Sequence, residues 1–159
     1  MHLRGPFREI LGLNMECGPI FEVPEMSLDR QRGQYLTYPI IESLSRIFKG
    51  GEKLVLGVVD VDLFFPRFNF VFGQANKMIG VAIVSTFRPR GEDNDGELFR
   101  NRALKGGLHE TGHLLGLGTC HDKWCVMYFS NTLMDIDEKM PRLCTRWKNR
   151  LRDMGVNVR

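Results

Sequence analysis

The chain has 159 residues, of which 43% are hydrophobic and 26% are charged, and its formal net charge is +3. This composition is ordinary for a globular protein, and the length suits one hydrophobic core, so we expect a single domain over residues 1–159. It excludes a membrane-spanning protein, since no apolar run is long enough, and the small charge excess is by itself no argument for nucleic-acid binding.

The first third of the chain is predicted to contain two helices and one interrupted strand. Residues 7–13 show a short helical pattern. Residues 15–23 are compatible with a strand, although a Gly-Pro pair interrupts them. Residues 34–49 carry apolar side chains at a helical period, and Gly50-Gly51 closes this helix.

The middle of the chain is predicted to form strands. Residues 54–61 are a continuous apolar run, which is typical of a buried parallel strand. Residues 69–72 form a shorter strand that we expect at a sheet edge, and residues 79–87 form a third strand. Asp60 and Asp62 invite a metal-binding interpretation, but they suit polar positions at a strand end equally well, and we leave them outside the site.

The last third of the chain is predicted to be helical. An acidic loop bounded by glycine, residues 92–96, precedes a long helix over residues 97–115. A final helix begins near residue 135, or after Pro141, and ends at residue 153. Helices that alternate with apolar strands indicate the α/β class.

The long helix carries the most informative pattern of the sequence, His109-Glu110-Thr111-Gly112-His113. Residues four apart lie above one another on a helix, so the two imidazoles converge on one point where a metal ion can bind. Glu110 follows the first histidine, where its carboxylate can take a proton from a zinc-bound water. The pattern predicts a zinc hydrolase, and the alternative is a chance occurrence on a surface helix.

The residues after this helix argue against chance. Gly116 stands three residues after His113, where the helix of a metzincin ends sharply. Cys120, Cys125 and Met127 follow, and Cys144 comes later. This combination resembles the archaemetzincin family of zinc metallopeptidases. The resemblance covers most of the chain beyond about residue 30, including residues 32–36, 57–63, 69–73, 125–127 and 129–131.

The resemblance implies a metzincin-like sandwich with a mixed, mostly parallel sheet, an antiparallel edge strand, an active-site helix and a C-terminal helix. It implies peptide hydrolysis with zinc, and Met127 as an apolar floor beneath the metal. Residues 69–73, at the cleft edge, would then bind an extended peptide by strand addition. Family members begin with a strand before the first helix, and only residues 1–5 are available for it here, so it is very short or absent or the sequence starts late.

Two positions depart from the family pattern. Thr119 stands where the family has a third histidine for the catalytic zinc, and a neutral hydroxyl is a poor zinc ligand. The family also has a late Cys-x-x-Cys that completes four thiolates on a structural zinc. Here that segment reads Cys144-Thr145-Arg146-Trp147, so each predicted zinc site is one ligand short.

His121 is the remaining histidine near either gap. It can complete the catalytic site, or join Cys120, Cys125 and Cys144 in a Cys3His structural zinc site, and we favour the second. Cys17 is a competing fourth ligand, although a lone cysteine is more often a small buried hydrophobic residue. A disulfide from Cys120 to Cys125 or Cys144 is the alternative to metal binding.

Three functions compete. The leading one is a zinc metallopeptidase with a peptide substrate, catalytic zinc on His109 and His113, Glu110 as the base, and a second, structural zinc. The second is a catalytically weak or inactive relative that binds peptide, because Thr119 replaces a ligand. The third is a zinc-stabilised module that binds nucleic acid through the basic C-terminal stretch. We expect the first of these functions, in a monomer that has no nucleic-acid or membrane partner. We also expect a cytoplasmic location, since no signal peptide is recognisable.

Overall fold

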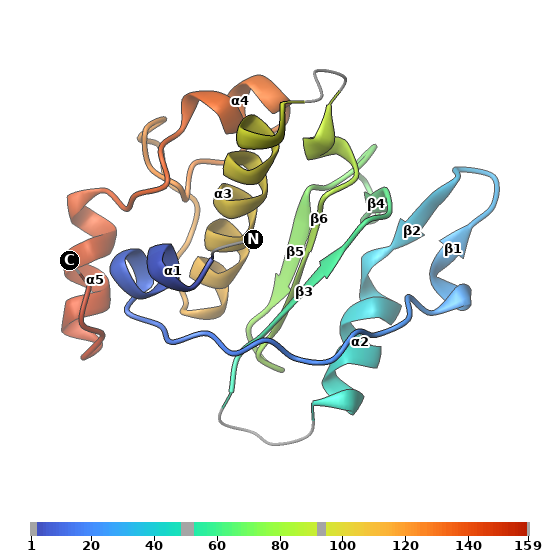
Figure 1. Ribbon diagram of the computed structural model, residues 1–159, viewed down its shortest axis with the longest axis horizontal. Helices are drawn as coiled ribbons and strands as arrows, with labels where there is room; N and C mark the ends of the chain where they lie inside the picture. Colours follow the sequence, from blue (N-terminus) through green and yellow to red (C-terminus); the bar gives the residue numbers. More distant parts are fainter. Residues whose placement is uncertain (1–2, 49–52, 92–94, 159) are drawn as a thin grey trace.

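The computed structural model describes residues 3–48, 53–91 and 95–158 (Figure 1). Its helices are α1 (Arg4–Leu11), α2 (Thr37–Ile47), α3 (Gly96–Leu114), α4 (Leu133–Glu138) and α5 (Thr145–Asp153). Its strands are β1 (Leu28–Asp29), β2 (Gln34–Leu36), β3 (Val55–Val59), β4 (Leu63–Phe64), β5 (Gly73–Asn76) and β6 (Val81–Ser85). The predicted α/β class is confirmed. None of the described helices is long and apolar enough to cross a membrane.

The strands form two small mixed sheets. In the first, of order β3-β6-β5, β3 runs parallel to β6 and β5 runs antiparallel to it, so the predicted antiparallel edge strand is present. In the second, of order β1-β2-β4, β1 is antiparallel and β4 parallel to β2. All five residues of β6 are buried, as expected for a central strand with a helix on each face.

Several predicted boundaries differ from the structure. Residues 15–23 form no strand, because Pro19 lacks a backbone N–H and the segment finds no partner strand. Residues 34–36 pair as β2 rather than extending the helix, and α2 begins at Thr37. Arg4 and Gly5 already belong to α1, so the segment expected to hold a first strand forms none from residue 3 on. Gly50-Gly51 and residues 92–94 lie outside the described residues.

The edge strand lies further along the chain than predicted. Val71 makes only one antiparallel bridge, to Leu63, and the regular strand begins at Gly73. The backbone N–H of Ser85 still donates to the carbonyl of Phe72, which keeps residues 71–72 close to β6. Residues 69–72 therefore form the approach to the edge strand rather than the strand itself.

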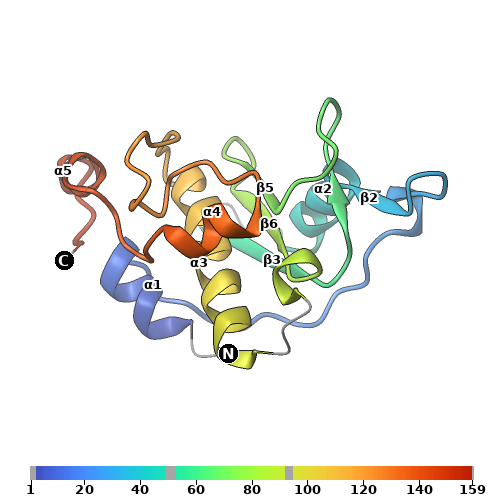
Figure 2. The ribbon, with the colours of Figure 1, turned by 90° about the horizontal axis from the view of Figure 1, so that it is seen from above.

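Two hydrophobic cores lie on the two sides of the sheet β3-β6-β5. Figures 1 and 2 show α3 on one side, with α1 and α5 beyond it, and α2 on the other. The first core joins α1, α3 and α5 to the segment after α3, through Phe7, Leu108, Val126 and Leu151 among others. The second joins α2 to β3 and β6, through Ile40, Leu44, Val59 and Ile83 among others. The C-terminal half of α3 is consequently buried on almost all sides.

Two buried cations attach α4 to α3. Arg102 donates through Nε and Nη2 to the carboxylate of Asp137, at 2.7 and 2.6 Å, and through Nη1 to the carbonyl of Pro89. Lys105 donates through Nζ to the carbonyls of Ile136 and Asp137, in the last turn of α4, at 2.9 and 3.1 Å. A six-residue helix is unstable alone, so these contacts fix the position of α4.

We expect Arg102→Met to lower the free energy of unfolding by about 2 kcal/mol, because it removes the hydrogen bonds of the buried guanidinium to the Asp137 carboxylate and the Pro89 carbonyl. Urea denaturation measures this change. Arg100→Met, on the exposed face of the same helix, is the matched control and should stay within about 0.5 kcal/mol of the parent. Equal effects of the two substitutions would show that the ion pair does not hold α4.

Candidate metal centre and catalytic cleft

Helix α3 brings the two predicted zinc-binding imidazoles together. The Nε2 atoms of His109 and His113 lie 3.1 Å apart, with the rings nearly perpendicular. Nδ1 of His109 lies 2.8 Å from the carbonyl of Val126, and Nδ1 of His113 lies 2.9 Å from the carbonyl of Leu117. A nitrogen this close to a carbonyl oxygen must carry the hydrogen. Both Nε2 atoms therefore present free lone pairs to the same point.

The spacing of the two nitrogens fits zinc. Two nitrogens bound tetrahedrally at the usual zinc–nitrogen distance lie about 3.3 Å apart. Burial lowers the pKa of His109 to about 3, with a contribution from the positive charge of Lys139, and burial also lowers the pKa of His113. Both rings are neutral at physiological pH, which is the form that binds a metal ion.

Glu110 lies against the edge strand. The position where a side chain on Gly73 would begin is 2.7 Å from Cγ of Glu110 and 2.6 Å from the carbonyl oxygen of Ile83. Only glycine fits between α3 and β6 at this point. Burial raises the pKa of the Glu110 carboxyl to about 8, although Lys139 opposes the shift. The carboxyl group is thus tuned to exchange a proton near neutral pH.

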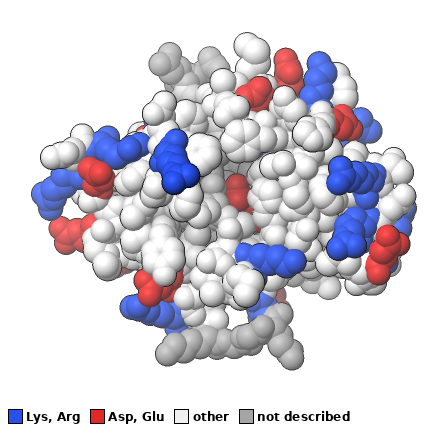
Figure 3. All heavy atoms as spheres, turned by 180° about the vertical axis from the view of Figure 1, so that it is seen from behind, with Lys and Arg blue, Asp and Glu red and all other residues white. Residues whose placement is uncertain are grey.

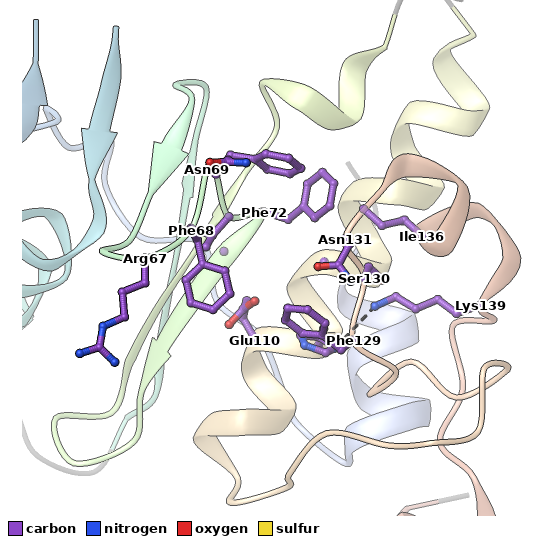
Figure 4. A pocket seen from close by; sticks show the side chains of 15 residues that line it. Arg67, Phe68, Asn69, Phe72, Glu110, Phe129, Ser130, Asn131, Ile136 and Lys139 are labelled. Carbon is purple, nitrogen blue, oxygen red and sulfur yellow. Dashed lines mark hydrogen bonds between the residues drawn. The ribbon is translucent and has the colours of Figure 1, made fainter. Parts of the chain in front are cut away.

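A cavity of about 400 Å³ opens beside these groups. Residues 67–73 line one side, His109 and Glu110 the base, and residues 129–131, Ile136 and Lys139 the other side (Figure 4). The walls include aromatic rings, of which Phe68, Phe72 and Phe129 are labelled in Figure 4. Figure 3 shows the molecule from behind the view of Figure 1. A hollow lies near the centre of this face, and an acidic side chain is recessed in it.

Polar side chains from β2 and from the turn before it hold the outer wall of the cavity. Nη2 of Arg32 donates to the carbonyls of Phe68 and Asn69, at 3.1 and 3.0 Å. Nε2 of Gln34 donates to the carbonyl of Asn69, at 2.9 Å. The carbonyls of residues 68 and 69 are not hydrogen-bonded within a sheet. The side-chain hydrogen bonds satisfy them instead and so fix the course of this segment.

Asp62 supports the same wall from the segment between β3 and β4. Its carboxylate accepts two hydrogen bonds from Arg88, at 2.6 and 2.8 Å, and the Arg88 guanidinium stacks over the Phe70 ring at 3.8 Å. Asp60 pairs with Arg90 at 2.8 Å. Both carboxylates therefore act as the polar strand-end residues that the sequence suggested, outside the candidate metal site.

Lys139 lies behind His109, in the wall formed by the segment after Met127. Its Nζ donates to the carbonyl of Tyr128 at 3.1 Å and lies 3.5 Å from Nδ1 of His109. The residue is only 3% exposed. Burial lowers the pKa of Lys139 to about 8, which still leaves it a cation at neutral pH.

The three later cysteines also come together. The sulfur atoms of Cys120, Cys125 and Cys144 all lie within 4.8 Å of one another, and those of Cys120 and Cys144 are 3.7 Å apart. Tetrahedral zinc with thiolate ligands requires a sulfur–sulfur distance of about 3.8 Å. All of these cysteines are free rather than paired in a disulfide. Burial raises the pKa of the Cys125 thiol, so a strong Lewis acid is needed to remove its proton.

Other predicted or competing ligands do not join these groups. His121 and Cys17 are exposed, and neither belongs to the group of sulfur atoms. Thr119 is exposed as well. In the described part of the chain, no third ligand atom from a His, Cys, Asp or Glu completes a group with His109 and His113.

The end of α3 follows the predicted course. Gly116 has a φ of 86°, and the N–H of Leu117 donates to the carbonyl of Gly112, which is the hydrogen bonding of a glycine-terminated helix. The chain then returns beneath α3. The sulfur of fully buried Met127 lies where a side chain on Gly112 would begin, so Met127 forms a floor under the turn between the two histidines.

Comparisons with known proteins agree with this geometry. A model described as "Peptidase family M54" matches residues 32–153. The archaemetzincin of Methanocaldococcus jannaschii is 36% identical over 160 residues, which cover 98% of this chain and 87% of the relative. The chain belongs to peptidase family M54, the archaemetzincins. The predicted enzyme class, a zinc metallopeptidase, is confirmed.

Solved structures of archaemetzincins share the fold. The crystal structure from Methanopyrus kandleri is 42% identical and has a TM-score of 0.76, covering 83% of this chain and 72% of that one. A zinc-dependent peptidase from Methanocorpusculum labreanum is 29% identical and has a TM-score of 0.82, covering 94% and 91%. The archaemetzincin of Archaeoglobus fulgidus, complexed with malonate, is 34% identical and has a TM-score of 0.72, covering 83% and 78%.

Sequence reasoning missed two residues of this archaemetzincin cleft. Gly73 was recognised only as the end of a family motif, and its close approach to Glu110 depends on how α3 packs on the sheet. Lys139 was not singled out at all, because a lysine after an acidic stretch is typical of a solvated helix end. Lys139 is buried by contacts with distant segments, so the sequence around it carried no signal of this role.

We expect Gly73→Ala to displace the Glu110 side chain, because a methyl group would overlap Cγ of Glu110 and the carbonyl of Ile83. Peptide hydrolysis should fall at least about 10-fold while far-ultraviolet circular dichroism stays unchanged. Gly5→Ala is the control, since a side chain at that position meets no atom within 4 Å. Full activity of Gly73→Ala would contradict this expectation, because it would show that the Glu110 side chain can accommodate the added methyl group without losing its function.

Proposed function

We propose that this chain hydrolyses peptide bonds in the cleft between α3 and β5, with zinc held by Nε2 of His109 and His113. The observation that carries the proposal is the 3.1 Å separation of these two nitrogens, with both Nδ1 atoms hydrogen-bonded to carbonyls. When bound, zinc would polarise the scissile carbonyl and lower the pKa of a water molecule. The zinc-dependent peptidase from Methanocorpusculum labreanum supports this choice of metal.

Glu110 is the proposed general base. Its carboxyl group lies between α3 and the edge strand and lines the cavity. Burial raises the pKa of this carboxyl group to about 8, and the positive charge of a bound zinc ion would lower it again. The carboxylate would then take a proton from a water molecule and return it to the leaving amine. The close fit of Glu110 against Gly73 leaves its side chain little freedom, which suits a group that must meet water in one orientation.

The edge strand is the proposed site for the peptide backbone. In the sheet β3-β6-β5, β5 pairs with β6 on one side only, and residues 67–73 line the cavity. An extended peptide laid along this edge would gain backbone hydrogen bonds and present alternate side chains to the cleft. The peptide substrate is therefore bound mainly through its main chain.

Cys120, Cys125 and Cys144 are the proposed ligands of a second, structural zinc. The 3.7 Å between the sulfurs of Cys120 and Cys144 and the burial of Cys120 and Cys125 support this proposal. Three thiolates bind zinc strongly, and that binding stabilises the folded state directly. His121 stays the predicted fourth ligand. Its ring would have to turn from solvent towards the neighbouring Cys120.

A catalytically weak or silent relative that binds peptide is the second candidate. The observation that favours it is the exposed Thr119 and, in the part of the chain that the structure describes, the missing third donor beside the two imidazoles. Two protein ligands hold zinc more weakly than three, so occupancy and rate should both fall. The relatives do not favour a nucleic-acid-binding module. A monomeric state and a cytoplasmic location stay predictions.

We expect Glu110→Gln to reduce peptide hydrolysis at least about 100-fold, because the amide cannot accept the proton. Cleavage of a mixed peptide pool, followed by mass spectrometry with excess zinc, measures this loss. Glu97→Gln, in the exposed first turn of the same helix, is the control and should retain full activity. Peptide binding without cleavage by the parent would instead support the silent relative.

We expect the purified parent to retain about one tightly bound zinc per chain after dialysis, and Thr119→His to retain more. The physical reason is that three thiolates form a strong site, whereas the imidazole pair lacks a third ligand. Elemental analysis measures the zinc content. No additional zinc in Thr119→His would show that Thr119 is not the weak point.

The same measurement on His121→Ala tests the fourth ligand. With His121 on the structural zinc, this variant loses the tight zinc and melts at a lower temperature. With His121 on the catalytic zinc, it keeps the tight zinc and its stability. Retention of the tight zinc therefore contradicts the predicted Cys3His site.

A further inference from the structure

Lys139 has more hydrogen-bond donors than the structure satisfies. An ammonium group carries three N–H donors, and the carbonyl of Tyr128 accepts one of them at 3.1 Å. Nδ1 of His109, at 3.5 Å, already donates to Val126 and cannot accept another. Within the described part of the chain, no carboxylate forms an ion pair with Lys139, and Glu110 and Asp135 act on it only at longer range. A buried cation with one acceptor is costly unless a further anion reaches it.

The neighbouring Lys105 shows what a purely structural buried lysine looks like in this protein. Its Nζ donates to two carbonyls at the end of α4, and it does not line the cavity. Lys139 is as deeply buried as Lys105 but faces the cavity beside Glu110 and Phe129 (Figure 4). The difference lies in the surroundings of the ammonium group, not in its burial.

The wall that carries Lys139 is rigidly held. The carboxylate of Asp135 accepts hydrogen bonds from the backbone N–H groups of Asn131 and Thr132 and from the Thr132 hydroxyl, all at 2.9 Å. Arg102 and Lys105 fix the other end of α4. A charge on so fixed a wall is preorganised for a ligand that enters the cavity.

We propose that Lys139 makes this cavity a carboxylate-binding subsite for the peptide substrate. The inference rests on the proposed function and names the substrate class: peptides that place an acidic side chain or their C-terminal carboxylate next to the catalytic histidines. A carboxylate would accept charge-assisted hydrogen bonds from the two unused N–H donors of Nζ. The aromatic walls of the cavity would contact the apolar part of the same residue.

Matched blocked pentapeptides test the proposal by calorimetry on the zinc-loaded protein. In the first pair, both ends of the peptide are blocked by acetylation and amidation, and one position carries either Asp or Asn. This position is moved along the peptide one residue at a time. The other pair differs by a free against an amidated C-terminus in the Asn peptide. We expect at least about 10-fold tighter binding of the carboxylate member in one pair, and the pair that responds identifies the source of the carboxylate.

Lys139→Gln removes the charge and retains an N–H for the Tyr128 carbonyl, so it should reduce the preference to less than about 2-fold. Lys53→Gln is the control, because Lys53 is exposed and pairs with exposed Glu16, and it should keep the full preference. A preference that persists in Lys139→Gln would assign the carboxylate to zinc or Arg67 and overturn the proposal. The proposal would also be overturned if the parent protein bound the two members of each pair with equal affinity.

Cleavage, followed by mass spectrometry in the same samples, separates this inference from the proposed function. A carboxylate preference that depends on Lys139, without cleavage, supports the subsite and contradicts the peptidase. Cleavage without any carboxylate preference supports the peptidase and contradicts the subsite.

Discussion

Two hydrogen bonds that turn the imidazoles of His109 and His113 towards each other are the constraint on which this structure depends. Spacing on α3 brings the rings to one face, but only the carbonyls of Val126 and Leu117 decide which nitrogen of each ring is free. Both acceptors belong to the segment that leaves α3 at Gly116 and returns beneath it. The candidate metal centre therefore depends on the course of residues 117–127 as much as on the helix.

The cysteine cluster holds that returning segment in place. Cys125 directly precedes Val126, the acceptor for His109, and the N–H of Cys144 donates to the sulfur of Cys125. The N–H of Val126 donates to the carbonyl of Arg142, and that of Cys120 to the carbonyl of Met127. Zinc bound by the thiolates would tighten this framework, so the proposed structural metal would orient the ligands of the catalytic one. If each zinc site is one ligand short, as the sequence predicts, the proposed coupling would weaken both sites together.

Local patterns made part of this protein predictable from sequence. The long helix was predicted at residues 97–115 and runs over Gly96–Leu114, because the glycine-bounded loop before it, its histidine motif and its glycine stop are all local features of the sequence. The pairing of Gln34–Leu36 in β2 was not predictable, since the apolar pattern of these residues continues smoothly into α2 and the partner strands lie elsewhere. The same reason hid Lys139, which contacts His109 although it stands 30 positions later in the chain. Contacts between distant segments leave no periodic signal in a single sequence.

In the proposed function, two imidazoles oriented by backbone carbonyls hold zinc beside Glu110. Anomalous diffraction at the zinc absorption edge, from crystals grown with excess zinc, tests it most directly. We expect two peaks, one between Nε2 of His109 and His113 and one among the sulfurs of Cys120, Cys125 and Cys144. A single peak at the cysteines, with the two histidines free of metal, would contradict it.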